Sequence, residues 1–252
     1  MAGHSKFANI KHRKNAVDAK RGKLFSKLAK GMISAARQGG GDMDANAKLR
    51  LAVEKAKAAN MTRDSIERAI KKGSGADADA ADFEEQLYEG YAPGGVALLV
   101  TCLTDNRNRT APDIKHIFDK RGGNLGAPGS VAFMFDFRSI FVIANGDRDE
   151  EALMELALEC GAEDVEVGDE YSTIFGDATE FMTVKEGLDA AEATIESAET
   201  GYVPQNTVAV EDKGAAEKLL KLIGFLEEND DVQDVYSNYD IPDEWLEEFQ
   251  SE

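Results

Sequence analysis

The sequence has 252 residues, a formal net charge of −19 and 42% hydrophobic residues. This length allows one to three domains with full cores, and no run reaches the ~20 apolar residues that a membrane-spanning helix needs. Cys102 and Cys160 lie far apart in apolar contexts, which predicts buried thiols in a reducing compartment rather than a disulfide or a metal site. No apolar segment follows the charges of the amino terminus, so we expect a cytoplasmic protein.

The charge is divided unevenly along the chain. Residues 1–72 hold 18 Lys and Arg against 6 Asp and Glu, whereas residues 73–252 hold 11 against 42. In the first thirty residues the only acid is Asp18, facing nine cations. A merely solvated helix usually mixes both signs, so this imbalance indicates a segment that contacts a polyanion.

Three helices are predicted in the basic region. Residues 8–22 are compatible with a helix but carry few core-forming side chains, so we expect them to order against a partner or another helix. Residues 23–38 show apolar side chains at helical spacing with cations on the other face. A second helix, capped by Asp44, is expected to run to about Asn60, and a third is expected to follow Thr62 and end at Lys72.

Residues 73–80 are small, polar and acidic, which predicts a linker between domains. Beyond it, strands and helices alternate. The predicted strands are 83–91, 96–103, 131–137, 140–144, 165–167, 172–175, 181–184, 207–210 and 232–237, and the predicted helices are 112–121, 150–161, 188–199 and 215–228.

This order predicts an α+β protein of three domains. The elements lack the long hydrophobic runs of a doubly wound parallel sheet, and small ferredoxin-like units fit better. We expect a basic helical nucleic-acid-binding domain at 1–75, a discontinuous α+β domain at 82–137 plus 206–239, an inserted α+β domain at 138–205 and an acidic tail at 240–252. For the tail, the alternatives are a solvated edge and an acidic surface that competes with nucleic acid or docks on a basic protein, and Trp245 and Phe249 are candidates to anchor it.

The candidate site residues are cations that would contact phosphates. Such contacts release counterions and make binding strongly dependent on salt. From the basic region they are Lys6, Lys11, His12, Arg13, Lys14, Lys20, Arg21, Lys23 and Lys27. Arg107 and Arg109, in the turn Asp105–Thr110 between a strand and a helix, are a second candidate contact, with a capped structural turn as the equal alternative.

Other motifs favour structural roles. The glycine-rich loop 122–130 lacks the Lys-Ser/Thr that closes a phosphate-binding loop and precedes a strand, so we expect a turn. The three histidines have no metal-ligand spacing, and no Ser/His/Asp or Cys/His arrangement stands out. We therefore predict no catalytic residue, no metal, no cofactor and no small-molecule substrate.

Several ordered motifs resemble the YebC family. They are Met1–Lys6, Asn9–Lys14, Asp18–Lys23, Lys55–Met61, Ile66–Gly73, Tyr88–Tyr91, Leu103–Thr110 and Gly122–Gly126, and together they cover essentially the whole chain. The resemblance implies a basic helical domain followed by two α+β domains in a crescent. It also implies a probable transcriptional regulator that binds DNA.

Relatives of the family also act in translation. They include the mitochondrial translational activator of cytochrome c oxidase subunit I and bacterial members linked to relief of ribosome stalling. The alternative implied function is therefore a ribosome-associated translation factor that contacts ribosomal RNA. Because the first motif begins at residue 2, leaving no room for a transit peptide, we expect a bacterial cytoplasmic member.

The sequence departs from the family pattern at four positions. Phe7 and Phe133 stand where the family usually has Trp, and Met43 and Ala47 replace prolines before the second helix. Phenylalanine keeps aromatic stacking but loses the indole N–H. Loss of the prolines is expected to loosen the connection at residues 39–46.

Overall fold

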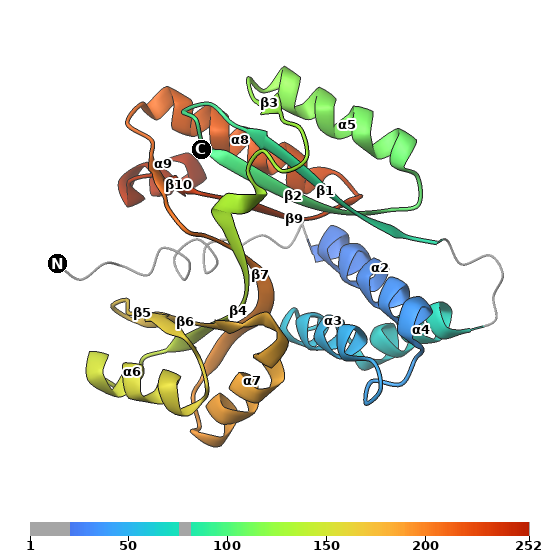
Figure 1. The fold of residues 1–252 in the computed structure, drawn as a ribbon, viewed down its shortest axis with the longest axis vertical. Coiled ribbons are helices and arrows are strands. Elements are labelled where there is room, and N and C mark those ends of the chain that lie inside the picture. Colours follow the sequence, from blue (N-terminus) through green and yellow to red (C-terminus); the bar gives the residue numbers. More distant parts are fainter. Residues whose placement is uncertain (1–20, 76–81, 252) are drawn as a thin grey trace. The chain divides into compact units, whose positions relative to one another are not determined.

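The computed structural model describes residues 21–75 and 82–251 (Figure 1). Contacts divide the chain into two units. The first combines the helical region up to residue 75 with residues 137–202, and the second combines the segment that ends at 136 with the segment from 203 onward. Among the described residues, no helix is long and apolar enough to cross a membrane.

The helical region consists of α2 (Arg21–Gly39), α3 (Ala47–Ala58) and α4 (Arg63–Ser74). Their apolar faces meet in a small core, to which α2 contributes Met32 and α3 contributes Leu49, both fully buried. Helices α2 and α4 approach closely at Gly73, where an added Cβ would collide with the backbone carbonyl of Ile33. Glycine is therefore required for this packing.

The cap of α3 differs from the prediction. Asn46, not Asp44, precedes the helix, and its side-chain oxygen accepts a hydrogen bond from the backbone N–H of Leu49 at 3.0 Å. The Asn46 amide also donates to the carbonyls of Ala35 at 2.9 Å and Gly40 at 2.8 Å, at the end of α2. A carboxylate cannot donate these bonds, which explains why asparagine takes this position.

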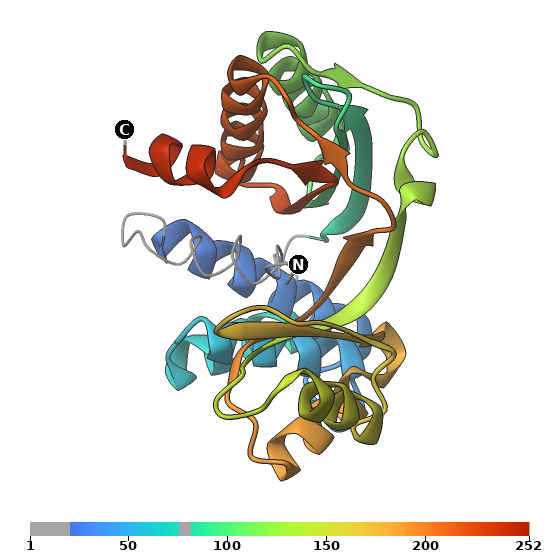
Figure 2. The same ribbon diagram turned by 90° about the vertical axis from the view of Figure 1, so that its left-hand side faces the viewer.

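The first sheet belongs to the second unit and has the strand order β3-β1-β2-β9. Its strands are β1 (Glu84–Tyr91), β2 (Ala97–Thr104), β3 (Asn124–Leu125) and β9 (Val232–Ser237), and each pair is antiparallel. Helices α5 (Arg107–Lys120) and α8 (Lys213–Glu228) cover one face of this sheet, as Figure 2 shows. Buried side chains such as Phe118 of α5 and Leu222 of α8 form the core beneath them.

The second sheet belongs to the first unit and has the order β5-β6-β4-β7. Its strands are β4 (Phe135–Ala144), β5 (Asp164–Glu166), β6 (Tyr171–Asp177) and β7 (Ile195–Pro204), with α6 (Glu150–Glu159) and α7 (Phe181–Ala190) in the connections. This chain order and strand order are those of a ferredoxin-like unit. Leu51 of α3 packs against its core, and Lys55 lies 3.7 Å from Glu199.

Three predicted elements between residues 131 and 199 are wrong. Residues 181–184 begin helix α7, and residues 195–199 belong to strand β7 rather than to a helix. The predicted strand 131–137 is a 3-10 helix, Ala132–Met134, followed by the start of the long strand β4. Buried Phe181, Val184 and Leu188 have helical spacing, which outweighs the strand preference of Phe181 and Val184 alone.

The mixed α+β class, with a helical region followed by two antiparallel sheets, is confirmed. The exact limits of the three predicted domains remain a prediction. The acidic end of the chain contains a short parallel pair, β8 (Val208–Ala209) with β10 (Tyr239–Asp240), and helix α9 (Asp243–Ser251). Leu246 of α9 is buried in the core of the second unit, and Trp245 and Phe249 pack against it.

A buried carboxylate fixes the glycine-rich loop. Glu89 of β1 is 5% exposed and accepts backbone hydrogen bonds from Gly129 at 2.5 Å, Val131 at 2.8 Å and Ala132 at 2.7 Å. Burial alone would raise the pKa of Glu89, but the three N–H donors outweigh it and hold the pKa below its usual value of 4.5. These N–H groups already donate hydrogen bonds to a carboxylate of the protein, as expected for a structural turn rather than a phosphate-binding loop.

Glu89→Gln should destabilise the protein by roughly 1.5–3 kcal/mol at pH 7, because a charged acceptor of three hydrogen bonds is lost. The lowered pKa means that the carboxylate contributes fully above pH 4.5 and loses its contribution as the pH falls below that value. Urea unfolding at pH 7 and at acidic pH should show the gap between wild type and variant shrinking in acid. A difference in stability that does not change with pH would contradict this role. So would an equal effect of Glu85→Gln, the same change at an exposed position on β1.

Candidate nucleic-acid interface

Helix α2 carries a stripe of cations. Its nineteen residues include five Lys or Arg and no Asp or Glu. At 100° per residue, Lys23, Lys27, Lys30 and Arg37 lie within about 80° of one another around the helix axis, along about 21 Å of its length. Lys23 is exposed and Lys27 is half-buried, while Met32 faces the core. We call these four residues the α2 stripe.

Cations on the two following helices are partly balanced by acids. Lys57 pairs with Glu54 at 2.8 Å, and Arg63 pairs with Glu67 at 2.7 Å. Lys71 and Lys72, exposed in the last turn of α4, make no ion pair with another described residue. Helix α2 has five Lys or Arg and no acid, whereas α3 has four against one acid and α4 four against two, so α2 carries the largest excess of positive charge of these three helices.

Several predicted site residues cannot be placed. Lys6, Lys11, His12, Arg13, Lys14 and Lys20 lie outside the described residues. Arg21 is the first residue of α2, and only its backbone is described. The structure thus brings Lys23 and Lys27 together on one helix face.

The Asp105–Thr110 stretch is the start of a helix. The prediction placed the helix at 112–121, but α5 begins at Arg107, and Asn106 caps it by accepting a hydrogen bond from the Arg109 N–H at 3.2 Å. Pro112 lies inside the helix. The helix starts at this cap although Pro112, its sixth residue, has no N–H to donate to the Asn108 carbonyl, and the prediction had placed the start at the proline.

Arg109 forms hydrogen bonds with two carboxylates of the protein. Its guanidinium donates to Asp105 at 3.0 Å and to Asp231, the residue before β9, at 2.8 Å. The hydrogen bond with Asp231 is the main reason why the pKa of Arg109 is raised. The Asp231 side chain is 7% exposed and also accepts from the Thr110 hydroxyl at 2.7 Å. Arg109 therefore neutralises a buried carboxylate that ties α5 to the sheet.

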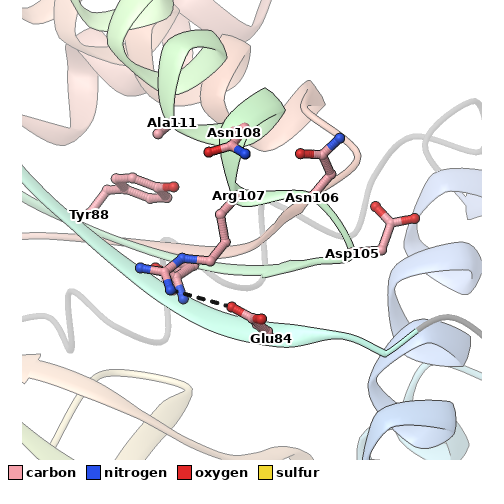
Figure 3. Close-up of a pocket in the computed structure, with 8 residues that line it drawn as sticks. Glu84, Tyr88, Asp105, Asn106, Arg107, Asn108 and Ala111 are labelled. Atoms are coloured by element: carbon pink, nitrogen blue, oxygen red, sulfur yellow. Dashed lines mark ion pairs between the residues drawn. The ribbon is translucent and has the colours of Figure 1, made fainter.

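Arg107 lies at the surface beside a hollow of about 540 Å³. Its guanidinium is 3.6 Å from the Glu84 carboxylate, and its side chain is 63% exposed (Figure 3). The hollow lies between the start of β1 and the first turn of α5, and its lining residues are Glu84, Gln86, Tyr88, Asp105, Asn106, Arg107, Asn108 and Ala111. Of the two predicted arginines, only Arg107 lines it.

Sequence reasoning missed the β1 contribution to this hollow. Glu84, Gln86 and Tyr88 alternate along a strand, so they share one face, and this alternation was the signal available in the sequence. Burial raises the pKa of the Tyr88 phenol, which keeps it neutral at physiological pH. Within the described ranges, no group of His, Cys, Asp or Glu side chains is arranged to hold a metal ion.

Comparison with known proteins gives the same family along most of the sequence. Residues 5–76 match the TACO1/YebC protein N-terminal domain, and residues 83–239 match the TACO1/YebC second and third domain. The chain is 56% identical to a probable transcriptional regulatory protein of Syntrophotalea carbinolica over 97% of each chain. It is 55% identical to a protein with the same description from Pseudomonas aeruginosa, over 97% of this chain and 98% of that one.

A solved structure agrees with the fold. The crystal structure of a conserved hypothetical protein from Aquifex aeolicus matches with a TM-score of 0.80 and 48% identity, covering 89% of this chain and 92% of that chain. The resemblance to the YebC family noted in the sequence is confirmed.

Asp231→Ala should lower the free energy of unfolding by roughly 2–4 kcal/mol, because Arg109 and the Thr110 hydroxyl both lose a buried acceptor. Urea unfolding followed by circular dichroism measures this change. Asp230→Ala, the same chemical change at the exposed neighbouring position, should have a much smaller effect. Equal effects of the two changes would show that the Asp231 contacts do not anchor α5.

Proposed function

The chain belongs to the TACO1/YebC family, and from this membership we propose that it is a non-enzymatic, cytoplasmic regulator of gene expression that binds DNA through its basic N-terminal domain. Its curated relatives carry the description of probable transcriptional regulatory proteins, which supports a regulatory role. The α2 stripe is the single observation that carries the nucleic-acid contact.

The α2 stripe favours a polyanionic partner on physical grounds. Lys23 and Lys27 are four residues apart, and like charges at this spacing destabilise a helix. Helix α2 itself contains no Asp or Glu. Duplex DNA presents one negative charge per about 1.7 Å of axis, so a cationic face about 21 Å long can neutralise several phosphates.

The phosphates of ribosomal RNA would satisfy the same cations. Contacts to the phosphate backbone position a protein without reading a sequence, so the stripe supports nucleic-acid binding in general. DNA is the ligand we propose first, because it follows from the description of the relatives. Binding to ribosomes is the alternative, and the experiment below distinguishes the two.

Lys23→Ala/Lys27→Ala should weaken binding to random duplex DNA and flatten its salt dependence. Each lost phosphate contact lowers the slope of log K against log salt by about 0.9, so the double variant should lose about 1.8. Fluorescence anisotropy with a labelled duplex over a series of salt concentrations measures both quantities.

The matched control is Lys120→Ala/Lys218→Ala, which removes the same charge from exposed positions on α5 and α8. This control should keep the wild-type slope. If both double variants lose the same slope, net charge and not the α2 stripe governs binding. If the wild type binds no duplex but sediments with purified ribosomes at moderate salt, ribosomal RNA replaces DNA as the ligand.

A further inference from the structure

The hollow beside Arg107 is not built to hold a phosphate. Its rim carries the carboxylates of Glu84 and Asp105, and Arg107 is the one cation among the described residues that line it. Glu84 lies 3.6 Å from that guanidinium and offsets its charge, while Arg109 is occupied by Asp105 and Asp231. A phosphate placed here would meet two carboxylates with one partly neutralised cation, which is unfavourable.

The same groups suit a ligand that donates hydrogen bonds. A carboxylate accepts hydrogen bonds from the amino groups of nucleobases, whereas it repels a phosphate. The carboxylates of Glu84 and Asp105 and the amide oxygen of Gln86 are acceptors on the rim, and the Gln86 nitrogen is already bonded to the Glu85 carbonyl at 2.7 Å. The rim therefore offers several acceptors close together.

The hollow also offers donors and an aromatic ring. The side chains of Asn108 and Tyr88 make no hydrogen bond to another residue in the described part of the chain, and both line the hollow (Figure 3). Asparagine pairs with the edges of bases through its amide, and tyrosine rings stack on unpaired bases. Tyr88 packs at the edge of the core of the second unit, so its ring is held in place.

We propose that this hollow binds one unpaired nucleobase with an exocyclic amino group, presented by a single-stranded segment. The proposal rests on the nucleic-acid binding proposed above and assigns base recognition to a site separate from the phosphate-binding α2 stripe. A base within a duplex is paired and stacked, whereas a base in a loop or single strand can turn outward and enter such a hollow. Glu84 accepts from the amino group, Tyr88 stacks and Asn108 contacts the base edge.

Cytosine and uracil provide a sharp test, because they share ring size and differ on one edge: cytosine has an amino group at C4 and an acceptor at N3, whereas uracil has a carbonyl at C4 and an N–H at N3. Labelled oligocytidylate and oligouridylate of about twelve nucleotides are compared by fluorescence anisotropy at the same salt concentration. The wild type should bind oligocytidylate about ten-fold more tightly. Glu84→Gln, Tyr88→Leu and Asn108→Ala should each bring this ratio close to one while binding to oligouridylate persists.

Glu85→Gln is the matched control for Glu84→Gln. It removes the same charge from the neighbouring, exposed position on the opposite face of β1, so it should raise binding to both oligonucleotides while keeping their ratio. Far-ultraviolet circular dichroism confirms that each variant is folded. Repeating the comparison with the deoxy oligonucleotides shows whether the strand is RNA or DNA.

The outcomes separate the two proposals. If neither oligonucleotide nor duplex DNA binds at low salt, the proposed function itself fails. If both oligonucleotides bind with equal affinity, or the preference for cytosine survives all three changes in the hollow, the base site is refuted while nucleic-acid binding by the α2 stripe stands.

Discussion

Helix α2 carries cations on one side and no acids, so the helical region depends on how the other side of α2 is packed. The like charges of the α2 stripe oppose helix formation, and burial of Leu28, Met32 and Ala36 against α3 and α4 must offset them. Gly73 permits the close approach of α4, and Asn46 joins the end of α2 to the start of α3. The apolar contacts thus fix the orientation of the cationic face of α2.

In the second unit, two buried carboxylates, Glu89 and Asp231, have to be stabilised in a part of the chain that is rich in acids. Asp231 is stabilised by Arg109 and Thr110, and Glu89 by three backbone N–H groups. Both carboxylates organise chain segments: Asp231 fixes the first turn of α5, and Glu89 fixes the glycine-rich loop. Because Arg109 is bound to Asp231, Arg107 is the one cation among the described residues that line the hollow, which favours hydrogen bonding there over phosphate binding.

The sequence was a good guide where the pattern was local. The helical spacing of Leu28, Met32 and Ala36 predicted α2, and the abrupt change in charge predicted a basic helical region before an α+β body. It failed where distant contacts decide the conformation. Residues 195–199 are rich in Glu and Ala, which favours a helix, but pairing within the second sheet makes them part of β7.

The candidate site likewise has one part that follows from local sequence pattern and one part that depends on distant contacts. The stripe could be predicted from residue spacing alone. The hollow could not, because it joins Glu84 and Tyr88 to a helix start about twenty residues further along the chain, and because the partner of Arg109 is 122 residues away. A helix start predicted at Pro112 also concealed Arg107 and Asn108 as residues of the first helical turn.

Binding at both the α2 stripe and the hollow can be tested by mapping the backbone amide chemical shifts of the full-length protein with and without a single-stranded oligonucleotide. Shift changes are expected in two places, along α2 from Lys23 to Arg37 and around Tyr88 and Asn108. Changes confined to the acidic helices α6 and α9, with α2 and the hollow unaffected, would contradict binding at these two places.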